Sequence, residues 1–91
     1  MTTVRVVISG RVQGVWYRAW TERQAAALGL DGWVRNRRDG TVEAVLSGDV
    51  AVVEQMISEL WDGPDLAQVK AIDRYPHDEA VTPGFAVKPT A

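Results

Sequence analysis

The sequence predicts an α+β fold in which two helices cover one face of an antiparallel sheet, with a short extra strand near the C-terminal end. Several short segments alternate apolar and other residues, as half-buried strands do, and one longer segment carries an apolar stripe at helical spacing. These segments follow the order β-α-β-β-α-β, with the extra strand last. The chain has 91 residues, of which 46% are hydrophobic, and no repeat or linker divides it. We therefore expect residues 1–91 to form one domain with a modest core.

The first half of the chain predicts a strand, a helix and a hairpin. In the first strand, Val4, Val6 and Ile8 share one face. Gly29 is a natural C-terminal stop for the helix, and Asp39-Gly40 supplies the hairpin turn. The expected boundaries are Val4–Ser9 for the first strand, Tyr17–Leu28 for the helix, and Gly32–Asn36 and Thr41–Leu46 for the paired strands.

The second half predicts a helix and two strands. Asp49 or Ser47 caps the helix, and Gly63-Pro64 ends it. Its apolar stripe consists of Val52, Val53, Met56, Ile57, Leu60 and Trp61. A strand over Val69–Tyr75 follows, in which an irregular alternation indicates a bulge. The last strand is expected over Phe85–Lys88.

This order of elements is that of the ferredoxin-like, split βαβ sandwich. In that topology the first two strands are parallel, and the third lies antiparallel between them. The carboxyl ends of the first two strands therefore share one edge of the sheet. The turn that follows the first strand and Asn36, at the end of the second, lie two strand spacings apart, or roughly 10 Å. Such a gap accommodates a phosphoryl group and a water molecule.

The turn between the first strand and the first helix is the most informative segment. It reads Gly10-Arg11-Val12-Gln13-Gly14-Val15-Trp16-Tyr17-Arg18. A glycine-bracketed turn that opens a helix directs backbone N–H groups and the positive end of the helix dipole at an anion. Arg18, in the first helical turn, adds a guanidinium that binds phosphate oxygens in a bidentate way. Neither a Walker A loop nor a GxGxxG fingerprint is present, and the alternative interpretation is a plain turn with one exposed arginine.

Charge and composition narrow the function further. Residues 1–38 hold seven arginines against Glu22 and Asp31, a net charge of +5, whereas residues 39–91 hold three basic and ten acidic residues, a net charge of −7. This asymmetry favours a local anion site over a nucleic-acid surface, with ordinary surface charge as the alternative. Arg11, Arg37 and Arg38 either steer anions or are plain surface charge. The chain holds no cysteine, and no targeting or membrane segment is visible, so we expect a cytoplasmic protein with no membrane contact.

Two segments resemble the signatures of the acylphosphatase family. Gly10–Arg18 is similar to Gly-x-Val-Gln-Gly-Val-x-Phe/Tyr-Arg, and Gly32–Glu43 is similar to Gly-x-Val-x-Asn-x-x-Asp-Gly-x-Val-Glu. The resemblance is close over residues 4–75 and weak over 76–91. It implies hydrolysis of a carboxylic–phosphoric anhydride to carboxylate and phosphate. It also implies that Arg18 binds the substrate phosphate and that Asn36 positions the water. The implied phosphate cradle consists of the backbone amides of Gln13, Gly14, Val15, Trp16, Tyr17 and Arg18.

The residue types fit that reaction. Asn36 is neutral, so it orients a water but does not take its proton. No metal-ligand cluster or cofactor motif is visible, so we expect neither a metal nor a cofactor. The carboxylate leaving group needs no general acid, and phosphoryl transfer needs mainly positioning and charge stabilisation. We expect a monomer that takes a small acyl phosphate and in which inorganic phosphate or sulfate compete for the site.

Several residues have two interpretations. Thr21 either supports the site from behind through a hydrogen bond, which we favour, or simply sits in the helix. Trp16 and Trp20 flank the cradle, and their side chains either form the rim of a substrate pocket or pack in the core. His77 is expected to be solvated. Trp33, Trp61 and Phe85 are expected in the core.

A different function class also remains open, namely a ferredoxin-like binding module for RNA or a small effector. The aromatic signature of RNA-recognition modules is absent from the sequence. An inactive regulatory relative is a third alternative, although Arg18 and Asn36 are both present.

Overall fold

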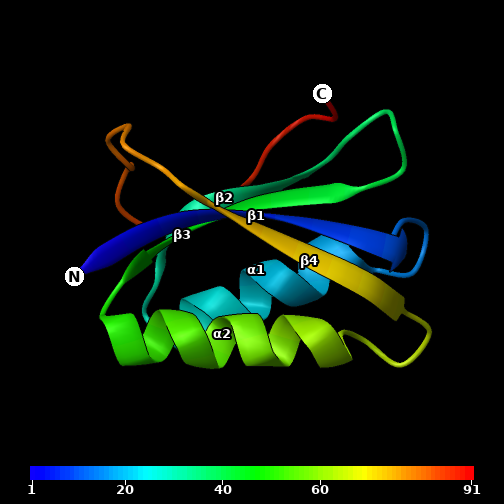
Figure 1. The fold of residues 1–91 in the computed structure, drawn as a ribbon, viewed down its shortest axis with the longest axis horizontal. Coiled ribbons are helices and arrows are strands. Elements are labelled where there is room, and N and C mark those ends of the chain that lie inside the picture. The colour runs from blue at the N-terminus through cyan, green and yellow to red at the C-terminus, as the bar shows by residue number, and fades with distance from the viewer.

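The computed structural model describes residues 1–91, and its elements follow the predicted order (Figure 1). The strands are β1 (Thr2–Arg11), β2 (Asp31–Asn36), β3 (Val42–Gly48), β4 (Gln68–Pro76) and β5 (Phe85–Val87), and the helices are α1 (Tyr17–Ala27) and α2 (Val50–Asp62). The largest difference from the expected boundaries is in β1, which is longer at both ends. No helix has the length and apolar character needed to cross a membrane.

The five strands form one sheet in the order β4-β1-β3-β2-β5. β3 lies antiparallel between β1 and β2, as predicted, so β1 and β2 end at the same edge. The expectation of a fully antiparallel sheet is wrong at one place, because β5 pairs parallel to β2, with Gly32 opposite Phe85. The chain reverses direction after β4 and crosses to the opposite edge of the sheet. It therefore runs along β2 in the same direction.

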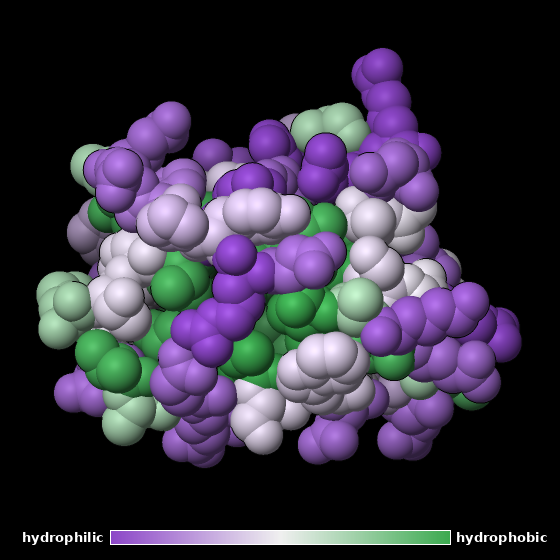
Figure 2. Space-filling model, viewed as in Figure 1, coloured by the Kyte–Doolittle hydropathy of each residue, from purple (hydrophilic) through white to green (hydrophobic).

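Both helices pack on one face of the sheet, and the core fills the space between them (Figure 1). Alternate strand residues such as Val6, Ile8 and Val34 point into this core, while their neighbours face the other side. Figure 2 shows apolar side chains along the seam between β4 and α2, with mainly hydrophilic side chains around the rim of this face. Arg74 of β4 bridges this seam through a bidentate pair with Glu54 of α2.

The predicted bulge occurs where β1 and β4 pair. The register shifts between Ser9 and Gly10, so that Gly10 faces Val69 while Ser9 faces Ala71. Gly10 has a φ of 123°, and a Cβ on it would lie 2.2 Å from the Gln68 carbonyl oxygen. Only glycine fits this close approach of two backbones. The bulge lies at the last residues of β1, next to the turn that leads into α1.

The ends of the helices agree with the local signals in the sequence. Asp49 is the N-cap of α2, and its Oδ1 accepts a hydrogen bond from the Ala51 N–H at 2.9 Å. α1 ends at Ala27, one residue before the expected boundary, because Leu28 is already the C-cap.

Two of the three aromatic residues assigned to the core are not there. Trp61 is 48% exposed because it lies at the edge of the α2 stripe, whose buried centre is Val53, Met56, Ile57 and Leu60. Trp33 is half-buried on the sheet face away from the helices, where Arg35 and Lys88 stack on its ring. Phe85 does pack against the core.

Candidate functional site

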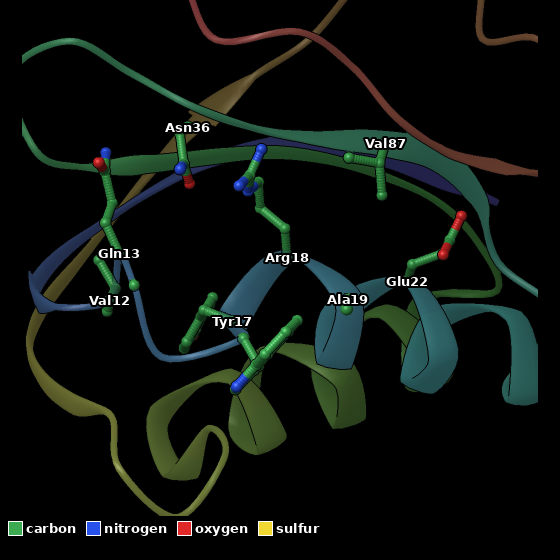
Figure 3. Close-up of a pocket in the computed structure, with 10 residues that line it drawn as sticks. Val12, Gln13, Tyr17, Arg18, Ala19, Glu22, Asn36 and Val87 are labelled. Atoms are coloured by element: carbon green, nitrogen blue, oxygen red, sulfur yellow. The ribbon is translucent and has the colours of Figure 1, made fainter.

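A cavity of about 480 Å³ opens at the edge of the sheet where β1 and β2 end (Figure 3). It lies between the start of α1, the end of β2 and β5. Its lining residues are Val12, Gln13, Gly14, Trp16, Tyr17, Arg18, Ala19, Glu22, Asn36 and Val87. The structure thus brings Arg18 and Asn36 to one cavity, although 18 residues separate them in the sequence.

The turn from β1 to α1 presents unpaired backbone donors along this cavity. Gly14 has a φ of 73° and Trp16, the N-cap of α1, a φ of 67°. The first hydrogen bond of the helix runs from the Trp20 N–H to the Trp16 carbonyl oxygen. None of the N–H groups of residues 13–19 donates to an acceptor within the protein. Alternating left-handed and right-handed residues with free N–H groups form a concave nest that suits an oxyanion.

Arg18 and Asn36 approach the cavity from opposite walls. In Figure 3 the Arg18 guanidinium rises from α1 towards the end of β2, where the Asn36 amide points down into the same space. Both residues are half-buried, and Arg18 forms no ion pair with any carboxylate. The Asn36 Oδ1 is buried and lacks a hydrogen-bond donor. A buried acceptor without a partner is costly, which indicates that this atom is kept for a molecule that enters the cavity.

The backbone of Asn36 is held on both sides. Asn36 pairs with Val42 of β3, and its carbonyl oxygen accepts a hydrogen bond from the Ala91 N–H at 3.0 Å. Ala91 in turn accepts from the Arg38 N–H at 2.8 Å. These bonds fix the end of β2, so the Asn36 side chain projects from a rigid strand end.

Gln13 ties the cradle to the β2–β3 hairpin. Its Nε2 donates to the carbonyl oxygens of Arg37 and Thr41, each at 2.8 Å. Both partners are acceptors only, which fixes the orientation of the amide. The family resemblance implies a role for the Gln13 backbone amide alone. This side-chain link has no signal in the sequence, because the partners of a side-chain amide depend on the tertiary arrangement.

Thr21 lies behind the cavity, and the side chain of Tyr17 is buried although Tyr17 belongs to the cavity wall. The Tyr17 hydroxyl donates to the Leu60 carbonyl oxygen, which joins the start of α1 to the end of α2, and burial raises the pKa of Tyr17 well above its usual range. Thr21 is fully buried, does not line the cavity, and its Oγ1 has no hydrogen-bond partner. Val15 is also buried in the core, so only its backbone faces the turn.

Besides Val12 and Ala19, which flank the cradle in the sequence, the structure adds Glu22 and Val87 to the expected wall. Glu22 lies one helical turn after Arg18, and Val87 reaches the cavity from β5. The i, i+4 spacing of Arg18 and Glu22 was a signal in the sequence. Val87 had none, because its place depends on the parallel pairing of β5. In Figure 3 both lie at the end of the cavity away from Gln13.

The remaining candidates are divided between the rim and other surfaces. Trp16 is 79% exposed at the cavity, whereas Trp20 is half-buried and packs against the Tyr17 ring with 5.6 Å between centroids. The side chains of Arg11, Arg37 and Arg38 are not part of the wall. His77, which was expected to be solvated, is half-buried and lines a separate cavity. No group of three or more His, Asp or Glu side chains gathers anywhere in the structure.

The family model and the curated relatives name one family. A family model described as Acylphosphatase matches residues 4–87, a span that includes every residue of the cavity wall. The acylphosphatase of Rhodospirillum rubrum is 51% identical over 90 residues, which cover 99% of each chain. That of Rhizorhabdus wittichii is 52% identical over 86 residues, or 94% of this chain and 87% of the relative. The crystal structure of acylphosphatase from Bacillus subtilis superimposes with a TM-score of 0.90 at 28% identity, covering 97% of this chain and 99% of that one.

Proposed function

This chain belongs to the acylphosphatase family and hydrolyses acyl phosphates to carboxylate and inorganic phosphate, and we propose how its residues divide that work. Arg18 and the backbone amides of residues 13–18 hold the phosphoryl group, and Asn36 positions the attacking water. The observation that carries this proposal is the row of backbone N–H groups at residues 13–19 that have no acceptor within the protein. They border the same cavity as the Arg18 guanidinium.

The cradle and Arg18 neutralise the charge of the phosphoryl group. Backbone N–H groups at the start of α1 and a guanidinium supply charge-assisted hydrogen bonds to its oxygens. Because the transferring phosphoryl group spreads charge over its three equatorial oxygens, preorganised donors stabilise the transition state without moving. Arg18 has no competing carboxylate partner, so its charge is available to the substrate.

Asn36 orients the water through hydrogen bonds. Its Oδ1 accepts a hydrogen bond from a water O–H, which satisfies the buried acceptor that has no partner within the protein. The amide takes no proton, so the proton of the water passes to a phosphate oxygen of the substrate. The leaving carboxylate is stable without protonation, and the site needs no general acid for this reaction.

Metal-independent turnover, a cytoplasmic location and a monomeric state are part of the same proposal, as is the organisation of residues 1–91 as one domain. Activity that disappears after exhaustive chelation and returns with added magnesium or zinc would contradict metal-independent turnover. Cell fractionation tests the cytoplasmic location, and sedimentation tests the monomeric state.

Phosphate binding followed by amide NMR tests the cradle directly. Inorganic phosphate is expected to shift the backbone amide signals of residues 13–18 and the side-chain signals of Arg18, and sulfate is expected to compete with it. The Arg18→Ala variant is expected to bind phosphate more weakly at the same amides, while Arg23→Ala, an exposed arginine of α1, serves as the matched control. Shifts confined to other parts of the chain would overturn the proposed cradle.

A further inference from the structure

A connected row of charged and aromatic side chains crosses the sheet face that the helices leave uncovered. Four strands and the residue that follows β5 contribute to it, in the order Tyr75, Arg5, Glu43, Arg35, Trp33 and Lys88. The Glu43 carboxylate pairs with the Arg5 Nη1 at 2.9 Å and with the Arg35 Nε at 2.7 Å. It is the only carboxylate in the row, so the row carries a net positive charge.

The excess of positive charge lies at the β2–β5 end of the row. The Arg35 guanidinium carbon is 4.7 Å from the centroid of the Trp33 ring, and the Lys88 Nζ is 4.6 Å from it. The two cations therefore lie within about 10 Å of each other, no more than a Debye length at moderate salt, and repel each other. Arg35 uses only its Nε on Glu43, and Lys88 forms no ion pair. Lys88 and the terminal nitrogens of Arg35 thus have no carboxylate partner, and ammonium and guanidinium groups held close together stabilise an anion.

A cavity of about 550 Å³ lies beside these two cations, between β2, β5 and the segment from His77 to Gly84. Trp33, Arg35, Lys88 and His77 line it, with Phe85 and Val81 as apolar wall and Glu79 as its single carboxylate. Lys88 and Ala86 face this cavity, whereas Val87, between them, faces the catalytic one. The two cavities are thus on opposite faces of the sheet.

We propose that this outer cavity binds a small organic oxyanion between Arg35 and Lys88. The two terminal nitrogens of Arg35 bind a carboxylate or phosphate group in a bidentate way, and Lys88 adds a second positive charge. The apolar side chain of Val81 contacts the carbon skeleton of the ligand. Since carboxylates and phosphates share this oxyanion chemistry, citrate and pyrophosphate serve as the two probes.

Tryptophan indole NMR signals test both cavities in one protein. Trp33 lines the outer cavity and Trp16 the catalytic one, and Trp33→Phe and Trp16→Phe assign their signals. At constant ionic strength, citrate or pyrophosphate at millimolar concentration is expected to shift the Trp33 signal along a saturable curve. The probe that binds more tightly shows whether the cavity prefers carboxylate or phosphate groups. If pyrophosphate also enters the catalytic cradle, the Trp16 indole signal shifts independently of the Trp33 signal.

Variants of Lys88 decide whether the cations carry this binding. Lys88→Gln is expected to weaken the saturable Trp33 response about tenfold, whereas Lys88→Arg is expected to retain it. Lys70→Gln, an exposed lysine of β4 outside the cavity, is the matched control and is expected to bind as the unchanged protein does. The proposal is overturned if neither probe gives a saturable Trp33 shift, or if Lys88→Gln responds as strongly as Lys70→Gln.

Discussion

Replacing Gln13 by alanine tests how the cradle is held against the β2–β3 hairpin. The substitution removes both hydrogen bonds from Nε2, to the carbonyl oxygens of Arg37 and Thr41. Each of these oxygens keeps one other donor, since Gly40 N–H donates to Arg37 and the Arg37 N–H donates to Thr41. A typical intramolecular hydrogen bond contributes about 0.5–1.5 kcal/mol, and neither acceptor is left unpaired, so we expect a loss of about 1–2 kcal/mol for the pair.

For a domain of this size, that loss lowers Tm by roughly 5–15 °C. Because the backbone of Gln13 belongs to the cradle and the hairpin follows Asn36, the two halves of the site also lose their fixed spacing. A small displacement of reacting groups costs up to about 10²-fold in rate, so kcat is expected to fall about ten- to hundredfold.

Thermal unfolding and phosphate release from a synthetic acyl phosphate measure these two effects. Gln55→Ala, an exposed glutamine of α2 that bonds only Glu59, is the matched control and is expected to leave kcat unchanged. Gln13→Glu is expected to be worse than Gln13→Ala, because a carboxylate repels the two carbonyl oxygens. A Gln13→Ala protein with unchanged Tm and kcat would refute the reasoning, as would an active Gln13→Glu protein.

Three further predictions concern charge, backbone strain and the cavity wall. Burial raises the pKa of Glu43, but Arg35 and Arg5 together outweigh it and hold that pKa below its usual value of 4.5. The unfolded chain therefore binds the proton of Glu43 more readily than the folded chain does. The stabilisation that the ionised Glu43 gives to the fold is complete above about pH 4.5 and is lost as pH falls through the folded pKa. In urea unfolding, the stability of Glu43→Gln is expected to depend less on pH below about pH 4.5 than that of the unchanged protein. Trp16 has a φ of 67°, so Trp16→Gly is expected to be about 1 kcal/mol more stable than Trp16→Ala in urea unfolding, and equal stability would contradict the strain. Glu22→Gln is expected to retain kcat within about threefold, whereas a loss of about 10² or more would identify Glu22 as a general base.

The sequence predicted the parts of the site that depend on local motifs and on strand order. The turn up to Arg18 and the end of β2 at Asn36 meet because β1 and β2 run in the same direction on either side of the antiparallel β3, and that order follows from the succession of elements. The bulge at Gly10 was also visible, as a break in the alternation of β4.

The parts that the sequence did not predict depend on tertiary contacts. The direction of β5 depends on where the segment after β4 crosses the sheet, and a strand of three residues has no pattern that shows its partner. Trp61 belongs to the apolar stripe of α2, but the sheet covers only the centre of that stripe. The position of Val87 in the wall likewise depends on the parallel pairing of β5 with β2, which no local pattern shows.

The most direct test of the account compares Arg18→Ala and Asn36→Ala in steady-state kinetics and in inhibition by inorganic phosphate, after circular dichroism shows both variants to be folded. Arg18→Ala is expected to weaken substrate binding, phosphate inhibition and turnover together, because the guanidinium binds the phosphoryl group in the ground state and the transition state. Asn36→Ala is expected to lower kcat by about 10²–10³ while phosphate inhibition stays nearly unchanged, because Asn36 acts on the water alone. A folded Asn36→Ala protein with near-normal kcat would contradict the water-positioning role. Near-normal turnover of Arg18→Ala as well would contradict the account as a whole.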